Sequence, residues 1–188
     1  MQCSLTESGG VHAKLAAEEH GMVLQVRWFL EQWDVEEDWI TSAIARANLR
    51  RYGKPRVLDG KFNLIVNVGK DVVLKLVTGA SATALNNANA NIGVGDSSTA
   101  AAVGQTGLQA ATNKKFKGMN TGYPTAVASQ KTSFQADFTS TEALFAWNEW
   151  CLASGNDPPT TGVMLSRKSE SFGTKGAALW TFNADLTA

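Results

Sequence analysis

The stretch Gly93–Ser98 (GVGDSS) has part of the glycine spacing of a phosphate-binding loop. A Walker loop ends in Gly-Lys-Ser/Thr, and a dinucleotide-binding fingerprint needs a third glycine that opens a helix. Neither pattern is complete, because Asp96 places a negative charge where the lysine would stand. We therefore expect a strand that turns sharply into a loop, in which Asp96, Ser97 and Ser98 bond to nearby backbone.

Nucleophilic and metal chemistry has four candidate residues, the histidines His12 and His20 and the cysteines Cys3 and Cys151. A Ser-His-Asp hydrolase needs a well-placed histidine as its general base, whereas both histidines stand in an N-terminal stretch with weak patterning. The four residues show no zinc-ligand spacing, and two cysteines do not make a disulfide framework. Cys151 is expected to be a buried small hydrophobic residue.

Paired carboxylates are the remaining chemistry to consider, because glycosidases use two of them. Glu142 and Glu149 flank the most aromatic segment of the chain, but their separation puts them on opposite faces of a strand. A turn cap and a strand-edge charge are the favoured interpretations, and Phe145, Trp147 and Trp150 are expected in the core before they serve as a carbohydrate platform. We therefore expect no enzyme, no catalytic residue, no cofactor and no metal.

Composition excludes further classes of function. The chain has 188 residues, of which 44% are hydrophobic and 18% charged, with 17 Lys+Arg and 17 Asp+Glu. This length suits one domain, or one domain and an arm. A balanced charge offers no electrostatic footprint for nucleic acid or an anionic membrane. There is no apolar run long enough to span a membrane, and Met1–Gly10 lacks the apolar core of a signal peptide.

The first part of the chain divides into an arm and a strand-helix region. Residues 1–21 are expected to form an N-terminal arm, although Val11–Glu19 could be a short helix. From Met22 onward apolar and polar residues alternate, which predicts a strand. Helices are expected at Thr41–Tyr52, between capping-type residues and Gly53, and at Asn67–Thr78, where valines leave a strand as the alternative. Residues 22–79 thus form a strand-helix N-terminal region.

The second part, residues 80–188, predicts a β-sandwich domain. Strands are expected at Ala90–Val94, Lys131–Phe138, Ala143–Ala153, Val163–Ser171 and Leu179–Leu186. Ala143–Ala153 is apolar on both faces, as a central strand would be, and glycines between the last two strands predict a hairpin with a longer loop. The predicted fold is mainly β, an antiparallel β-sandwich, jelly-roll-like or immunoglobulin-like, with one or two short helices. Its core should contain Phe134, Trp147, Trp150, Trp180 and Phe182.

Several segments occur in an order that resembles a family of virion structural proteins of tailed bacteriophages. They are Asn63–Gly69, Leu85–Ala100, Gln105–Leu108, Phe116–Met119, Tyr123-Pro124, Phe145–Trp150, Met164–Lys168 and Gly173–Lys175. In that family an Ile-Gly/Ala-Val-Gly strand opens a β-sandwich that ends in an apolar strand. The resemblance covers about residues 61–188.

The resemblance implies a non-enzymatic structural component of the virion. A capsid decoration (cement) protein that binds the lattice of the major capsid protein is preferred, because the chain is short and lacks fibrous repeats. A tail, baseplate or fibre component is the first alternative, and a small receptor- or glycan-binding module near Glu142–Trp150 is the second. The expected partners are other virion proteins and further copies of the chain, since a symmetric lattice presents many linked sites.

The N-terminal region is predicted to carry much of the contact with partners. Trp28, Trp33 and Trp39 stand close together in the sequence beside Arg27 and a group of acidic residues. Aromatic side chains and arginine are the usual anchors of protein interfaces. The alternative is that these tryptophans pack against the sandwich as its missing edge strand.

Overall fold

The computed structural model describes residues 24–61, 63–128 and 130–188. The predicted arm, residues 1–21, lies outside the described residues together with Cys3, His12 and His20.

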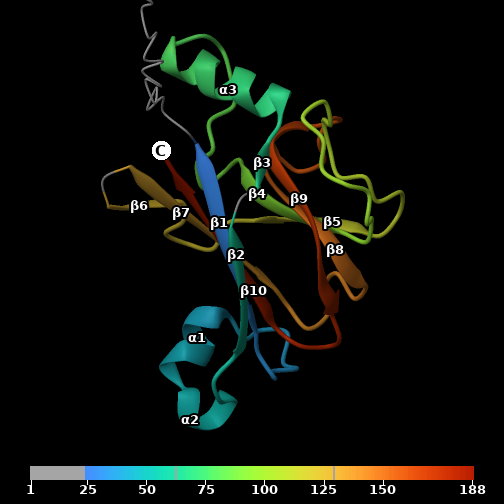
Figure 1. Ribbon diagram of the computed structural model, residues 1–188. Coiled ribbons are helices and arrows are strands. Elements are labelled where there is room, and N and C mark those ends of the chain that lie inside the picture. Colours follow the sequence, from blue (N-terminus) through green and yellow to red (C-terminus); the bar gives the residue numbers. More distant parts are fainter. Residues whose placement is uncertain (1–23, 62, 129) are drawn as a thin grey trace, which may run out of the picture.

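Two antiparallel five-stranded sheets pack face to face (Figure 1). Sheet 1 has the order β2-β1-β10-β7-β6 and sheet 2 has the order β3-β9-β8-β4-β5. The strands of sheet 1 are β1 (Gln25–Gln32), β2 (Arg56–Lys61), β6 (Thr125–Ala128), β7 (Lys131–Phe138) and β10 (Trp180–Thr187). The strands of sheet 2 are β3 (Leu64–Ile65), β4 (Ala90–Gly95), β5 (Lys114–Gly118), β8 (Ala146–Gly155) and β9 (Gly162–Thr174). The predicted mainly β, antiparallel sandwich is confirmed.

The core between the sheets follows from alternation along the strands, because successive side chains point to opposite faces. Phe134 and Ala136 of β7 and Phe182 of β10 point inward and are buried. They meet Trp150 of β8, whose ring centroid lies 4.6 Å from that of Phe182. The five residues predicted for the core are all buried there: Phe134, Trp147, Trp150, Trp180 and Phe182. This part of the prediction is confirmed.

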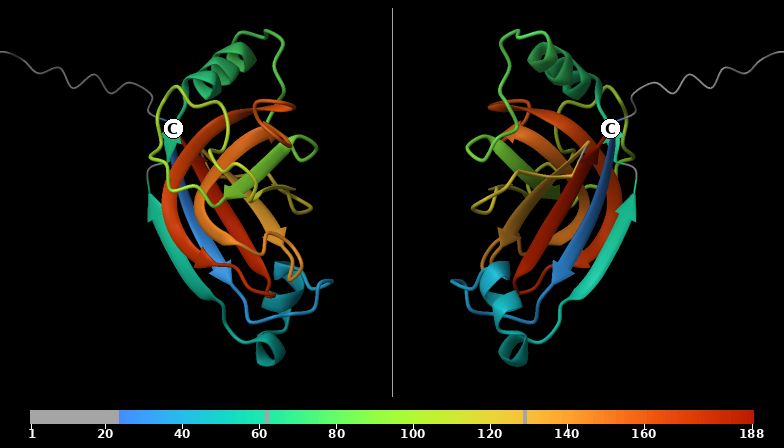
Figure 2. Two further views of the ribbon diagram at one scale, coloured as in Figure 1. Left: turned by 90° about the vertical axis from the view of Figure 1, so that its right-hand side faces the viewer. Right: turned by 90° about the vertical axis from the view of Figure 1, so that its left-hand side faces the viewer.

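Three helices flank the sandwich: α1 (Ser42–Ala47), α2 (Leu49–Tyr52) and α3 (Asn67–Val77). The single helix expected over Thr41–Tyr52 is broken at Asn48, whose backbone leaves the helical region. The helix expected near Asn67–Thr78 is present as α3, so the strand alternative is wrong. Figures 1 and 2 show α1 and α2 at one end of the sandwich and α3 at the other.

Two predictions about chain organisation need correction. Residues 22–79 do not stand apart from the sandwich, because β1 lies inside sheet 1 and pairs with β10 from Gln25↔Thr187 to Gln32↔Trp180. The last two long strands do not form a hairpin, since β9 belongs to sheet 2 and β10 to sheet 1. Gly176 therefore lies in a crossover between the sheets, whereas Gly173 lies near the end of β9. Both features are long-range pairings, which local patterning does not encode.

Candidate functional site

The outer face of sheet 2 is covered by the segment from Asp96 to Asn113, which we call the covering loop. It is drawn in yellow-green beside β8 and β9 in Figure 1. Leu108 of this loop joins a small apolar cluster with Cys151 and Met164 on the outer face of the sheet. The sandwich core and this second cluster thus lie on opposite faces of sheet 2.

A buried ion pair lies beneath the covering loop. Glu149 of β8 and Arg167 of β9 are both fully buried, and Arg167 Nη2 lies 2.6 Å from Glu149 Oε2. The carboxylate also accepts hydrogen bonds from the backbone N–H groups of Gln109 and Ala110, at 3.0 and 2.7 Å. Both oxygens of this carboxylate are therefore engaged by the protein itself.

The guanidinium of Arg167 fastens a second part of the same loop. Its Nη2 donates to the backbone oxygen of Thr99 at 2.8 Å, and its Nη1 donates to Gln105 Oε1 at 2.9 Å. Gln105 in turn accepts from the N–H of Ala102 and donates to the oxygen of Ala100. One arginine and one glutamine thus replace regular secondary structure as the support of this loop. The expectation that Glu149 is a strand-edge charge is wrong, because its side chain is fully buried on β8, which has β9 and β4 on its two sides.

The glycines of Gly93–Ser98 make room for side chains that pack on β4. A Cβ at Gly95 would lie 2.6 Å from Glu149 Oε1, and one at Gly93 would lie 2.5 Å from the ring of Phe116. The glycine pattern therefore serves close packing of a carboxylate and an aromatic ring. After β4, Ser97 Oγ accepts from the N–H of Thr99, as expected, whereas Asp96 accepts from the side chain of Asn113.

The other carboxylate, Glu142, lies in the turn before β8, as predicted. Burial raises its pKa, but a hydrogen bond from Lys117 and one from the Thr139 backbone outweigh this and hold the pKa below its usual value. Nearby, the ammonium of Lys175 is buried and donates to the backbone oxygen of Thr139 at 2.6 Å. Burial lowers the pKa of Lys175 to about 8, and the charge of Glu142 acts against that shift.

The aromatic segment around Glu149 does not form a surface site. Trp147 and Trp150 are fully buried in the sandwich core, and Cys151 is buried on the other face of β8. Burial raises the pKa of the Cys151 thiol far above its usual value, which agrees with the expected role as a small hydrophobic residue. Trp147 and Trp150 therefore cannot form a surface platform for a sugar, and they lie in the core as expected.

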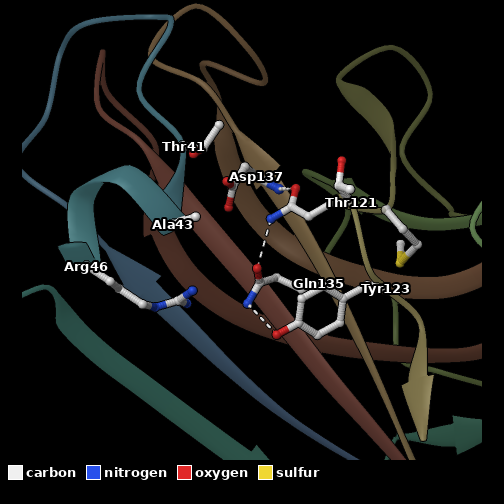
Figure 3. A pocket seen from close by; sticks show the side chains of 9 residues that line it. Thr41, Ala43, Arg46, Thr121, Tyr123, Gln135 and Asp137 are labelled. Carbon is white, nitrogen blue, oxygen red and sulfur yellow. Dashed lines mark hydrogen bonds between the residues drawn. The ribbon is translucent and has the colours of Figure 1, made fainter.

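An open polar hollow lies on the outer face of sheet 1 instead. It has a volume of about 440 Å³ and lies between α1 and the loop from Met119 to Tyr123. Figure 3 shows Arg46 reaching from α1 toward Gln135 and Tyr123, with Asp137 to one side of them, near Thr41. Both Gln135 and Asp137 belong to β7 and are almost fully buried.

The floor of this hollow is a hydrogen-bonded ladder across β7 and β10. Asp137 Oδ1 accepts from the hydroxyl of Thr181 at 2.8 Å, and its Oδ2 accepts from the N–H of Ser42 at 2.8 Å. The side chain of Gln135 donates to Asn183 Oδ1 at 2.8 Å and accepts from Asn120 Nδ2 at 2.9 Å. These polar groups are fixed in position by partners on several elements.

The four predicted interface residues do not share one surface. Trp28 is buried in the sandwich core, where it meets Phe172 edge to face at 4.8 Å, and Trp33 is buried in a separate cluster with Val35 and Leu179. Arg27 is exposed on β1, and Trp39 is 62% exposed in the loop before α1. Trp28 and Trp33 therefore cannot act as surface anchors in this fold. They pack into the protein, as the alternative proposed, but β1 lies within sheet 1 rather than at its edge.

Glu149 was considered as a site residue from the sequence, whereas Arg167, Gln135 and Asp137 were not. These three occupy positions of expected strands, and alternation alone does not predict that a distant segment will cover them. The sequence did show that Gln135 and Asp137 share the face of β7 opposite its three apolar residues. This pattern places the two side chains together on the outer face of the sheet. That α1 and the Met119–Tyr123 loop would cover this face is not visible in the local pattern.

No family model matches the chain, and no curated protein or solved structure matches it. Within residues 24–61, 63–128 and 130–188, no helix has the length and apolar character of a membrane span. The same described residues contain no group of three His, Cys, Asp or Glu side chains that could hold a metal ion.

Proposed function

We propose that this protein is a non-enzymatic structural component of a tailed-phage virion, and in particular a capsid decoration protein that binds the lattice of the major capsid protein. The observation that supports this most directly is the covering loop fastened by Arg167 and Glu149. The most deeply buried ion pair of the described chain holds a displayed loop in place, with each partner engaged internally. A buried ion pair that is bonded within the protein in this way favours a role in holding a rigid binding surface over a role in catalysis.

The resemblance to phage virion proteins supports the same proposal. Its segments are scattered along the sequence, yet four of them meet at this pair. Leu85–Ala100 and Gln105–Leu108 supply Thr99 and Gln105, whereas Phe145–Trp150 and Met164–Lys168 supply Glu149 and Arg167. An ordered set of motifs that converges on one three-dimensional arrangement is what a shared fold would require. In the particle we expect further copies of the chain and other virion proteins as partners, and a tail, baseplate or fibre position remains the alternative.

The copy number of the chain in purified particles tests this proposal. Quantitative mass spectrometry should find it at a number comparable with that of the major capsid protein. A small number relative to the capsid protein would place it in the tail and overturn the decoration role. Its absence from particles would overturn the virion role altogether.

The exposed Trp39 provides a second test, because it is the predicted interface tryptophan that the fold leaves on the surface. Trp39→Ala should weaken binding of the purified protein to particles that lack it, without unfolding the protein. Trp39 fluorescence should be quenched by acrylamide in the free protein and protected on the particle. Normal particle binding by Trp39→Ala would remove Trp39 from the interface.

A further inference from the structure

We infer that the outer face of sheet 1 carries a binding groove for a neutral oligosaccharide. The groove combines the hollow beside α1 with a second hollow of about 220 Å³, and Tyr123 lines both of them. The second hollow continues along the sheet past Phe29, Asn183 and Asp185. The inference concerns a ligand site and does not depend on where in a virion the protein is placed.

The polar groups of the groove are of the kind that sugars require. A sugar hydroxyl both donates and accepts hydrogen bonds, so its site needs donors and acceptors side by side. The amide of Asn120 donates one bond and accepts one within the protein, so it keeps a second donor and a second acceptor position at the first hollow. Each oxygen of the Asp137 carboxylate likewise accepts one bond and keeps a further acceptor position, whereas the Gln135 amide is fully bonded and holds the others in place. Their mutual bonds hold them in place before any ligand arrives, which lowers the entropic cost of binding.

Tyr123 gives the groove an aromatic surface at the junction of the two hollows. Aromatic rings pack against the apolar C–H faces of other rings while a polar tip remains available for hydrogen bonding. The hydroxyl of Tyr123 accepts a long hydrogen bond from Gln135 Nε2, at 3.4 Å, which leaves its own proton to donate. Figure 3 shows this hydroxyl directed toward Gln135 at the floor of the hollow.

The charges of the groove favour a neutral ligand. Four charged side chains line the two hollows, two of each sign: Arg46, Lys131, Asp137 and Asp185. Lys131 Nζ already pairs with Asp185 at 2.7 Å, and Arg46 Nη2 pairs with Glu31 at 2.5 Å. A phosphate or a uronic acid would meet carboxylates beside each cation, so the groove offers no net attraction to an anion.

The position of the groove also argues against an extended peptide as its occupant. Peptides that add to a sheet bind through the unpaired backbone of an edge strand. The floor here is formed by β7 and β10, each of which has a strand on both sides. Only side chains face the ligand, and they present hydroxyl, amide and carboxylate groups instead of a backbone ladder.

Titration of the full-length protein with neutral hexasaccharides tests the inference. The probes are hexaoses of glucose, mannose, galactose and N-acetylglucosamine, with a sulfated hexasaccharide as the anionic comparison, followed by amide shifts in NMR. At least one neutral hexaose should bind with a Kd below about 10 mM. Its binding should shift the NMR signals of the backbone amides of the Met119–Tyr123 loop and of Ala43 and Arg46. No binding of any neutral hexaose at that concentration, or tighter binding of the sulfated one, would overturn the inference.

Variants locate the site. Thr121 is exposed and lines the first hollow, so Thr121→Trp should fill the groove and weaken binding at least tenfold while the fold is kept. Tyr123→Ala should give a similar loss by removing the aromatic surface. Tyr52→Phe is the control. The chain has two tyrosines, and Tyr52 lies on α2 beside Arg51, outside the groove, so this variant should bind the hexaose with unchanged affinity. Binding that survives both groove variants would place the ligand elsewhere and overturn the inference.

Discussion

The two outer faces of the sandwich use an arginine–glutamate pair in different ways. Arg167 and Glu149 on sheet 2 lie beneath the covering loop and have no exposed side-chain surface. Arg46 of α1 and Glu31 of β1 pair on the outer side of sheet 1, where their side chains are 38% and 13% exposed. The closest distances are nearly the same, 2.6 and 2.5 Å. The difference lies in what covers the pair. On sheet 2 a loop supplies backbone partners and closes the surface, and on sheet 1 the polar groups remain beside an open hollow.

The largest effect should come from Glu149→Gln. This change leaves the buried guanidinium of Arg167 without its counter-charge and removes an acceptor from the N–H groups of Gln109 and Ala110. Breaking a buried pair on one side costs about 3–5 kcal/mol, so the free energy of unfolding should fall by this amount in urea denaturation. The covering loop should also become sensitive to limited proteolysis.

Glu31→Gln is the matched control on the open face. Exposed ion pairs are worth about 0–1 kcal/mol and are screened by salt. The variant should therefore lose less than about 1 kcal/mol, and less still in high salt. Equal losses in Glu149→Gln and Glu31→Gln would contradict the distinction between a closed and an open face.

A smaller effect is expected from Gly95→Ala. The new Cβ would lie 2.6 Å from Glu149 Oε1 and 2.9 Å from the Cβ of Ala110. Overpacking of this kind typically costs about 1–3 kcal/mol. Gly118→Ala is the control in the neighbouring strand β5, because the nearest atom, Asn91 Oδ1, would lie 3.9 Å away. Thermal unfolding should separate the two variants, and a loss confined to Gly118→Ala would contradict the packing role of Gly95.

The dependence of stability on pH should reveal Lys175. Its pKa is about 8 in the folded protein against an ordinary value of 10.5. Below pH 8 both folded and unfolded chains carry the charge, and burying it opposes folding. Between pH 8 and 10.5 the folded protein loses the proton while the unfolded chain keeps it, so the contribution of Lys175 to stability rises with pH.

Lys175→Met should remove this rise. Urea denaturation at pH 7.5 and pH 10 should therefore show the wild type gaining stability relative to Lys175→Met across that window. Lys70 on α3 is exposed, so Lys70→Met should keep the wild-type dependence. A constant difference between the wild type and Lys175→Met at both pH values would disprove the lowered pKa.

The smallest change in stability is expected from Trp39→Ala. Of the six tryptophans, Trp39 is 62% exposed and the other five are buried. Its replacement should shift the free energy of unfolding by less than about 0.5 kcal/mol and should remove most of the fluorescence that acrylamide quenches. Trp33→Ala, in contrast, should cost about 3–5 kcal/mol because it empties a packed cluster. Similar losses for the two variants would contradict the assignment of Trp39 to the surface.

Much of the strand content could be predicted from the sequence. The apolar side of β7, with Phe134, Ala136 and Phe138, alternates with polar residues, and that period is enough to identify a strand and its buried face. The two-sided apolar pattern of β8 likewise predicted a central strand. The short strands β2, β3, β5 and β6 were missed because a few residues without alternation carry no periodic signal.

The candidate sites could not be predicted in the same way. The sequence alone determined the strand periodicity and the five aromatic residues predicted for the core, because each depends on neighbours within a few positions. It favoured the helix at Asn67–Val77 over a strand for the same reason, but it did not identify Trp28 and Trp33 as buried. Only the tertiary structure decided that β1 pairs with β10, that Arg167 meets Glu149 beneath the covering loop, and that α1 shields Asp137. The physical reason is that burial and charge pairing depend on which distant segment covers a strand face. Identical alternation can therefore end in a solvated surface, a closed ion pair or an open groove.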